Sequence, residues 1–190
     1  MVPIGTTKRL ILCPLELADA ERIQELFPVW EVVQYLAKGA VPWPYPPDGA
    51  LTYCRDIALP AAERGEAWHF TLRLRTNPAQ LIGLITLELG DEHNRGFWLG
   101  VPWRGQGLMS EACDWATDYW FETLRFPILR TSKAIANTAS RRISLKQGMR
   151  VVANVERGYV CGRLPGEQWE ITAEEWRAWK AFHPVREYAR

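Results

Sequence analysis

One stretch of the chain constrains its fold more than any other, because a strand-like run, a turn with two glycines and a long helix follow one another there. Residues 96–101 read Gly-Phe-Trp-Leu-Gly-Val, and residues 103–112 read Trp-Arg-Gly-Gln-Gly-Leu-Met-Ser-Glu-Ala. The first N–H groups of a helix have no partner inside the helix, and the helix dipole adds partial positive charge. Gly105 and Gly107 have no Cβ, so a phosphate can approach their backbone closely. Taken alone, the turn is more typical of a tight strand-to-helix connection than of an anion site.

A second segment, at residues 137–149, turns this weak signal into a specific one. It contains Asn-Thr-Ala-Ser at 137–140 and Lys-Gln-Gly-Met at 146–149. Together the two segments resemble the acetyl-CoA signature of the GNAT superfamily of N-acyltransferases. Within it the chain is most similar to the RimJ/RimL branch, which acetylates N-termini of ribosomal proteins and includes relatives that act on other amines. Residues 8–12, 41–45 and 171–176 also resemble that branch, in the same order.

The pattern of elements predicts an α+β fold for residues 1–190 as a single acyl-CoA N-acyltransferase domain. We expect strands at 10–12, 68–75, 81–89, 96–101, 128–136, 149–155 and 168–171. Helices are expected from Ala20 (capped by Asp19), at 30–37, at 48–58, after the glycine turn, at 138–147 and from Thr172. In residues 68–75, alternation predicts one apolar face and one wetter face. The resemblance implies a mixed, mostly antiparallel central sheet with helices on both faces. It also implies a splay between the fourth strand (96–101) and the fifth strand (128–136).

Composition excludes several classes of protein. Hydrophobic residues make up 47% of the chain and charged residues 24%, with a net charge of +1 and no basic block. This balance argues against nucleic acid as the main partner, since phosphate contacts need clustered Lys and Arg. We find no apolar run of membrane-spanning length and no signal-peptide pattern, so we expect a cytoplasmic protein without membrane contact. The four cysteines and three histidines show no metal-ligand spacing, so we expect reduced, mostly buried thiols and no metal.

The resemblance implies which residues bind acetyl-CoA. The strand backbone at Phe97, Trp98 and Leu99 would pair with the pantetheine arm, and the backbone N–H groups from Arg104 to Met109 would hold the pyrophosphate. Met109 departs from the family pattern, which usually has a small residue there. The basic residues Arg141, Arg142 and Lys146 either meet the adenine-side phosphates or form an ordinary charged helix face. The predicted cofactor-binding residues are Phe97, Trp98, Leu99, Arg104, Gly105, Gln106, Gly107, Leu108, Met109 and Asn137.

Two serines compete for the role of proton donor to the departing thiolate. Many GNAT enzymes carry a tyrosine seven residues after the asparagine, and here that position is Ser144. The RimJ/RimL branch instead has a serine three residues after it, which is Ser140 here. A hydroxyl within reach can relay a proton or hydrogen-bond the thiolate. Ser140 is therefore the predicted catalytic residue, with a capping role at the helix N-terminus as its alternative.

The general base is less sharply defined. Family members often carry an acidic residue just before the fourth strand, where this chain has Asn94 and Arg95. Glu88 at the end of a strand, Asp91 and Glu92 in the next loop, or water-linked carbonyls are the alternatives. We retain Glu88 as the candidate base.

The leading hypothesis is an N-acetyltransferase that transfers an acetyl group from acetyl-CoA to a primary amine by direct attack in a ternary complex. The alternative is a non-catalytic acyl-CoA-binding sensor or interaction module of the same fold, since the usual tyrosine is missing. The acceptor stays open between a protein N-terminus and a small-molecule amine. A monomer and a homodimer are both consistent with the sequence.

Overall fold

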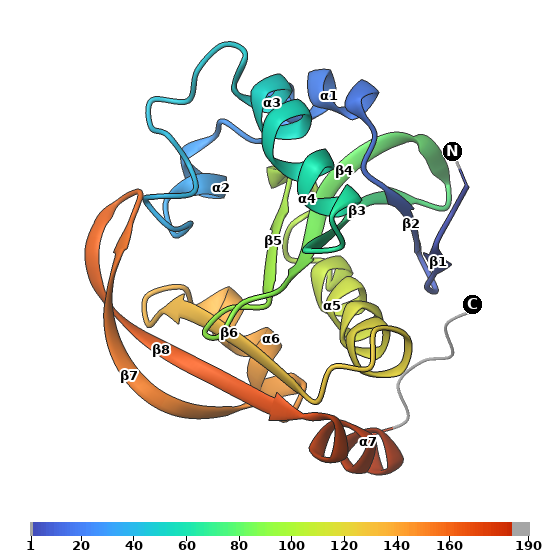
Figure 1. Cartoon of the computed structure of the whole chain (residues 1–190), viewed down its shortest axis with the longest axis vertical. Helices are drawn as coiled ribbons and strands as arrows, with labels where there is room; N and C mark the ends of the chain where they lie inside the picture. Colours follow the sequence, from blue (N-terminus) through green and yellow to red (C-terminus); the bar gives the residue numbers. More distant parts are fainter. Residues whose placement is uncertain (1, 184–190) are drawn as a thin grey trace.

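The computed structural model describes residues 2–183 and is built around two antiparallel sheets (Figure 1). The first sheet has five strands in the order β1-β2-β3-β4-β5 and the second has three in the order β6-β8-β7. The first sheet contains β1 (Gly5–Thr6), β2 (Leu10–Pro14), β3 (Ala67–Leu74), β4 (Asn77–Glu88) and β5 (Arg95–Leu99). The second contains β6 (Ile128–Ala134), β7 (Arg150–Tyr159) and β8 (Gly162–Thr172). The sheet therefore breaks between β5 and β6, where the family resemblance implies the splay.

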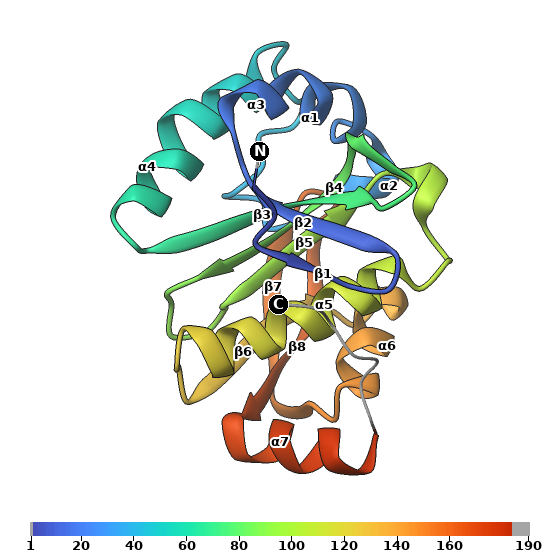
Figure 2. The same cartoon turned by 90° about the vertical axis from the view of Figure 1, so that its right-hand side faces the viewer.

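Helices cover both faces of the first sheet (Figure 2). On one face lie α1 (Ala20–Leu26), α2 (Trp30–Val33), α3 (Gly49–Thr52), the π-helix η2 (Tyr53–Ala58) and α4 (Leu59–Glu63). The other face packs against α5 (Leu108–Asp118) and the π-helix η4 (Tyr119–Thr123). The helix α7 (Ala173–Phe182) follows β8 and lies on the far side of α5, and α6 (Thr138–Lys146) lies beside the second sheet. Two separate apolar cores result, one on each face, and they fix the position of β5 between them. The predicted α+β class with helices on both faces is confirmed.

The structure corrects two local expectations. The alternate residues of β3 do not form a wetter face, because α1–α4 cover them and leave Arg73 only 3% exposed. Asp19 does not cap α1: one carboxylate oxygen accepts the Glu16 N–H (3.0 Å) and the other pairs with buried Arg73. An arginine buried among apolar residues needs such a partner, and the Asp19 carboxylate supplies it.

The hairpin of β7 and β8 is longer than the sequence predicts, and its tip reaches the segment after α2 (Figure 1). The Val160 N–H donates to Leu36 O (3.0 Å) and the Cys161 N–H donates to Gln34 O (3.0 Å). Because these bonds join segments far apart in the sequence, no local pattern indicates them. They hold the α2 segment over the space between β5 and β6.

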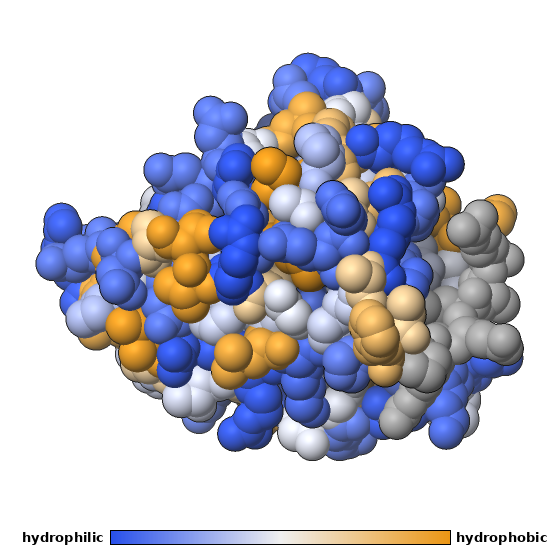
Figure 3. All heavy atoms as spheres, turned by 90° about the horizontal axis from the view of Figure 1, so that it is seen from below, coloured by the Kyte–Doolittle hydropathy of each residue, from blue (hydrophilic) through white to orange (hydrophobic). Residues whose placement is uncertain are grey.

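The α7 cap and the burial of three of the four cysteines agree with the sequence predictions. Thr172 and Glu175 form the predicted capping box at α7, and Cys13, Cys54 and Cys113 are buried free thiols, while Cys161 is exposed. Seen from below, the surface is mostly hydrophilic, with apolar side chains in small separate groups (Figure 3). Within residues 2–183, no helix is long and apolar enough to cross a membrane.

Candidate functional site

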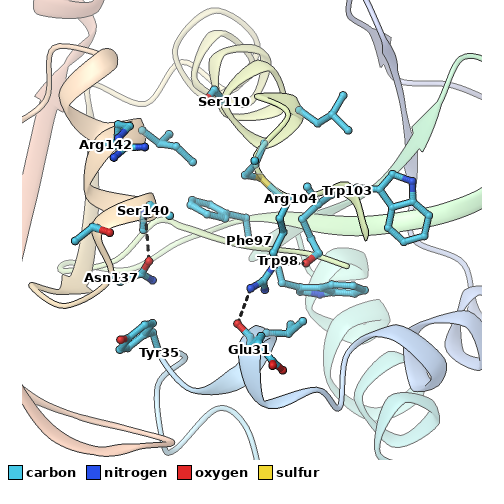
Figure 4. Close-up of a pocket in the computed structure, with 18 of the residues that line it drawn as sticks. Glu31, Tyr35, Phe97, Trp98, Trp103, Arg104, Ser110, Asn137, Ser140 and Arg142 are labelled. Carbon is cyan, nitrogen blue, oxygen red and sulfur yellow. Dashed lines mark hydrogen bonds between the residues drawn. The ribbon is translucent and has the colours of Figure 1, made fainter. Parts of the chain in front are cut away.

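A cavity of about 490 Å³ opens where β5 and β6 diverge. Its walls come from α2, the end of β5, the first turn of α5 and the first turns of α6, and Figure 4 shows Asn137 and Ser140 facing Phe97 across it. Most of the predicted binding residues line this one cavity. Those that do so are Phe97, Trp98, Leu99, Arg104, Gly105, Gly107, Leu108, Met109, Asn137 and Ser140.

The start of α5 presents unpaired backbone donors. Gly107 is the N-cap residue with φ of 77°, and no side chain caps the helix. The Glu111 N–H is bonded to Gly107 O (3.1 Å), so the N–H groups of residues 108–110 precede the first bond within the helix. Gly105 also has a positive φ of 73°, which a residue with a Cβ adopts only with strain. The turn therefore combines free donors, the helix dipole and close access, as an anion site requires.

A buried carboxylate braces this turn from behind. Glu111 accepts hydrogen bonds from Thr7 Oγ1, from the Arg9 N–H (2.7 Å) and from Arg9 Nε (2.8 Å). Arg9 Nη1 also donates to Gln106 O (2.8 Å), which ties the turn to the start of β2. Burial opposes ionisation of Glu111, but these hydrogen bonds hold its pKa below the ordinary value. Sequence reasoning missed this brace, because its members are about a hundred residues apart.

The open edge of β5 supplies further backbone groups. The Gly100 N–H donates to Ile82 O (2.9 Å), and Trp98 lies opposite Leu84 in the same register. In an antiparallel pair, bonded and non-bonded positions alternate, so Trp98 uses its backbone on β4 whereas Phe97 and Leu99 direct theirs toward the splay. This corrects the expectation that all three backbones could pair with an extended ligand.

Arg104 has a different role from that of a free cation in a turn. Its Nε donates to Leu99 O (2.9 Å), which is the carbonyl on the open edge, and its Nη1 donates to Glu31 O (2.6 Å). These two bonds join β5 to α2 across the mouth of the cavity (Figure 4). The guanidinium keeps its positive charge beside the anion site while it fixes the position of both walls.

The closed end of the splay is held by Asn94. Its N–H donates to Arg130 O (2.7 Å), and its Oδ1 accepts the Arg130 N–H (2.8 Å). Its Nδ2 donates to Gly90 O (2.6 Å) and Glu88 O (3.2 Å). Only an amide both donates and accepts in this way, so an acidic side chain would not replace Asn94 here. The resulting vertex joins β5 to β6 and explains why no base stands at this position.

The start of α6 is capped, unlike that of α5. Asn137 Oδ1 accepts the Ser140 N–H (3.2 Å), so the asparagine satisfies the donor that a capping serine would serve. The Ser140 hydroxyl has no hydrogen-bond partner among the described residues and lines the cavity. Its capping alternative is therefore not the arrangement in the structure.

Ser144 lies behind the cavity wall rather than on it. Its side chain is fully buried and accepts a hydrogen bond from Lys133 Nζ, which also donates to Thr131 Oγ1 (2.8 Å). Burial, with a contribution from Arg95, lowers the pKa of Lys133 to about 7. The position that usually holds a tyrosine thus serves a buried lysine.

The basic residues of α6 divide between two roles. Arg142 and Lys146 line the cavity, whereas Arg141 forms an ion pair with Glu167 (2.8 Å). Gln106 and Glu88 are not among the lining residues: the Gln106 amide donates to Pro102 O (3.0 Å), and Glu88 ends β4. Burial raises the pKa of Glu88, which suits a proton acceptor. Among residues 2–183, no group of three or more His, Cys, Asp or Glu side chains is arranged to hold a metal ion.

Comparison with known proteins decides the family. The sequence profile described as "Acetyltransferase (GNAT) domain" matches residues 9–150, which is most of the chain. The chain belongs to the GNAT acetyltransferase family. As a member it is an acetyl-CoA-dependent enzyme, and the predicted resemblance is confirmed. Comparison with curated protein sequences gives no match.

Several solved acetyltransferase structures have the same fold. RimL, a ribosomal L7/L12 α-N-protein acetyltransferase solved with coenzyme A, superposes with a TM-score of 0.76 at 13% identity, over 90% of this chain and 98% of that one. Mycobacterium smegmatis RimJ with CoA-disulfide gives 0.78 at 16% identity, over 95% and 94%. The ribosomal-protein-S5-alanine acetyltransferase from Vibrio fischeri gives 0.75 at 13% identity, over 91% and 98%. At these identities the likeness establishes the fold.

Proposed function

We propose that this GNAT protein transfers an acetyl group from acetyl-CoA to a primary amine, by direct attack of the amine in a ternary complex. The observation that carries the proposal is the uncapped start of α5 beside the open edge of β5. The acceptor class is a protein N-terminus or a small-molecule amine. The protein-N-terminal option is supported by the likeness to RimL, a ribosomal L7/L12 α-N-protein acetyltransferase, and to the ribosomal-protein-S5-alanine acetyltransferase. We keep residues 1–190 as one catalytic domain in this proposal.

Each part of the cavity fits one part of acetyl-CoA. The N–H groups of residues 108–110 suit the pyrophosphate, and Arg104, Arg142 and Lys146 add positive charge around it. The backbone of Phe97 and Leu99 suits the amides of the pantetheine arm, as an added strand would. In this order the thioester would lie at the Phe97 end of β5, opposite Ser140 (Figure 4).

The chemistry needs a polarised carbonyl, a neutral amine and a protonated leaving group. The Phe97 N–H on the open edge is a donor for the carbonyl oxygen, where charge develops as the amine attacks. Ser140 donates a proton or a hydrogen bond to the departing thiolate. Glu88, with its raised pKa, is the candidate acceptor for the amine proton, directly or through water.

A turnover screen tests this proposal against a non-catalytic acyl-CoA sensor. Thiol release from acetyl-CoA is measured with N-terminal peptides and with small amines, beside a measurement of acetyl-CoA affinity. The enzyme is expected to release thiol with at least one amine class and to acetylate that amine. Binding of acetyl-CoA without release from any amine would favour the sensor instead.

A further inference from the structure

A histidine occupies the closed end of the splay, beyond the Phe97 end of the cavity. The Ser132 N–H on β6 donates to His93 Nδ1 (3.0 Å), next to the Asn94 bonds that join the two strands. The imidazole is therefore held between β5 and β6 at their vertex. Sequence reasoning assigned His93 no role, because nothing in its neighbours indicates this placement.

The bond to Ser132 fixes which nitrogen carries the proton. An Nδ1 that accepts a backbone N–H is unprotonated, so the neutral ring carries its hydrogen on Nε2. Burial lowers the pKa of His93 to about 4, and Lys133, Arg157 and Arg95 act in the same direction. At neutral pH the ring is thus an uncharged hydrogen-bond donor through Nε2, and it has no free lone pair with which to act as a base.

His93 Nε2 lies beside the space that the missing side chain of Gly96 leaves open, next to Phe97 and just outside the residues that line the cavity. His93 Nε2 lies 3.9 Å from the point where a Cβ on Gly96 would stand, and among residues 2–183 no other atom from outside its chain neighbours lies within 4 Å of that point. The next residue, Phe97, directs its N–H toward the same open edge of β5. A side chain at Gly96 would reduce the space between these two donors.

We infer that His93 Nε2–H is a second donor, beside the Phe97 N–H, to the carbonyl oxygen of the acyl group. The inference rests on the proposed function, because that function runs the pantetheine from α5 along β5 toward this vertex. A neutral donor suits this place, since a charged imidazolium would stand beside Lys133 and Arg95. His93 is then a catalytic residue of the acyl transfer and takes no proton itself.

The step balances without a proton from His93. The amine lone pair forms the new C–N bond, and the carbonyl π electrons move to the oxygen, where both donors hold the negative charge. Collapse of this intermediate re-forms C=O and breaks the C–S bond, so the electron pair leaves with the CoA sulfur. The amine proton passes to Glu88 or water, and the sulfur is protonated from Ser140 or water.

Two substitutions of His93 separate the Nε2 donor from the Nδ1 atom that accepts the Ser132 N–H. Asn in place of His93 keeps an oxygen near the Nδ1 position for the Ser132 N–H and removes the Nε2 donor. Gln in place of His93 places an amide N–H near the Nε2 position. Loss of one such donor typically lowers kcat by about 10²–10³-fold. We expect His93→Asn to lower kcat in that range with little change in acetyl-CoA affinity, and His93→Gln to recover part of it.

A spectroscopic measurement tests the bond without relying on turnover. Infrared difference spectra are recorded with acetyl-CoA labelled with ¹³C at the thioester carbonyl, bound to wild type, His93→Asn and His183→Asn. His183 is exposed and stacks on Trp179, so it serves as the matched control. The carbonyl band is expected at a higher wavenumber in His93→Asn than in wild type and unchanged in His183→Asn. ¹⁵N spectra of wild type should show the His93 Nε2–H resonance shift when acetyl-CoA binds, which needs no variant to fold.

The outcomes separate this inference from the proposed function. If acetyl-CoA binds but the carbonyl band is the same in wild type and His93→Asn, the inference is wrong and the proposed function stands. A band difference without turnover on any amine would support the donor and reject catalysis. Absence of acetyl-CoA binding at millimolar concentration would overturn both. An unmoved His93 Nε2–H resonance in the acetyl-CoA complex would also overturn the donor.

Discussion

Two helices begin at the same cavity, and their first turns differ in one respect. At α5 the N-cap is Gly107, whose missing side chain leaves the first N–H groups unpaired. At α6 the N-cap is Asn137, whose side chain accepts a hydrogen bond from the Ser140 N–H. The first helix start can therefore bind an anion, whereas the second positions a hydroxyl. The comparison shows that a helix N-terminus becomes a phosphate site only where the protein leaves its donors free.

The largest effect is expected from Gly107→Val. A valine strongly disfavours a φ of 77°, so the turn must change shape and its donors must move from the phosphates. Loss of two hydrogen bonds to charged oxygens, at about 1.5–3 kcal/mol each, should weaken acetyl-CoA binding by roughly 100-fold or more. Isothermal titration calorimetry measures this affinity.

Gly65 offers a matched control for backbone strain. It has a similar φ of 71° and follows α4, and apart from its chain neighbours no atom of the described residues lies within 4 Å of its potential Cβ. Gly65→Val should lower stability without changing acetyl-CoA affinity. Equal affinity in wild type and Gly107→Val would mean that the phosphates bind elsewhere.

Ser140→Ala is expected to act on rate rather than on affinity. A positioned proton donor typically contributes about 10²–10⁴-fold to the rate. We expect kcat to fall by at least about 100-fold, because the hydroxyl faces the cavity without another partner. Steady-state kinetics, with acetyl-CoA affinity measured separately, distinguish this from a binding role.

Ser144→Ala is the control for that experiment. It removes an acceptor from buried Lys133, so it should lower the free energy of unfolding by about 1–3 kcal/mol and leave kcat nearly unchanged. If Ser140→Ala changed only the affinity, Ser140 would be a binding residue. If both variants retained full kcat, the thiolate would leave without help from either serine.

Lys133, which is buried behind α6, should make the free energy of unfolding depend on pH. With a pKa of about 7, Lys133 in the folded protein releases its proton well below the ordinary lysine range of about 10.4. Between these values the unfolded chain binds the extra proton, so this residue makes the free energy of unfolding rise with pH. The slope is at most about 1.4 kcal/mol per pH unit, and the cost of the buried charge is fully present below pH 7.

Lys133→Met isolates this contribution. Urea unfolding of both proteins from pH 6 to pH 9 should show the free energy of wild type, minus that of the variant, increasing with pH. A difference that stays constant over this range would mean that Lys133 keeps an ordinary pKa in the folded protein.

The smallest effect is expected at the cap of α6. Asn137→Ala removes the acceptor for the Ser140 N–H, which typically costs about 1 kcal/mol. Asn137→Ser keeps a capping oxygen and should preserve stability. If both variants lose the same acetyl-CoA affinity, the Asn137 amide itself contributes to binding. Chemical denaturation gives the stability. An Asn137→Ala variant as stable as wild type would show that the cap contributes nothing.

The sequence predicts those parts of the site that depend on neighbours along the chain. The glycine turn, the helix after it, the α6 start and the α7 capping box are all local patterns, and the structure contains each of them. The splay between β5 and β6 was also predicted, but from family resemblance rather than from the residues. Local chemistry therefore predicts the glycine turn as the candidate anion site without any knowledge of distant contacts.

The sequence does not indicate contacts between residues that lie far apart along the chain. Arg9 reaches Glu111 and Gln106, Asn94 bonds to Arg130, and His93 bonds to Ser132. The alternation of residues in β3 predicted a wetter face. The prediction was wrong because no local signal shows that α1–α4 cover Arg73. Such contacts follow from tertiary packing, which overrides periodicity.

The contrast between the two helix starts can be measured directly by NMR. Acetyl-CoA is titrated into the ¹⁵N-labelled protein, and the backbone amide shifts of residues 108–110 are compared with that of Ser140. We predict large downfield proton shifts at 108–110, where phosphate oxygens accept the free N–H groups, together with shifts at Phe97 and Leu99. The Ser140 amide, held by Asn137, should move much less. Saturating acetyl-CoA that left 108–110 unmoved, or shifted Ser140 more than them, would contradict the assignment of the α5 turn as the phosphate site.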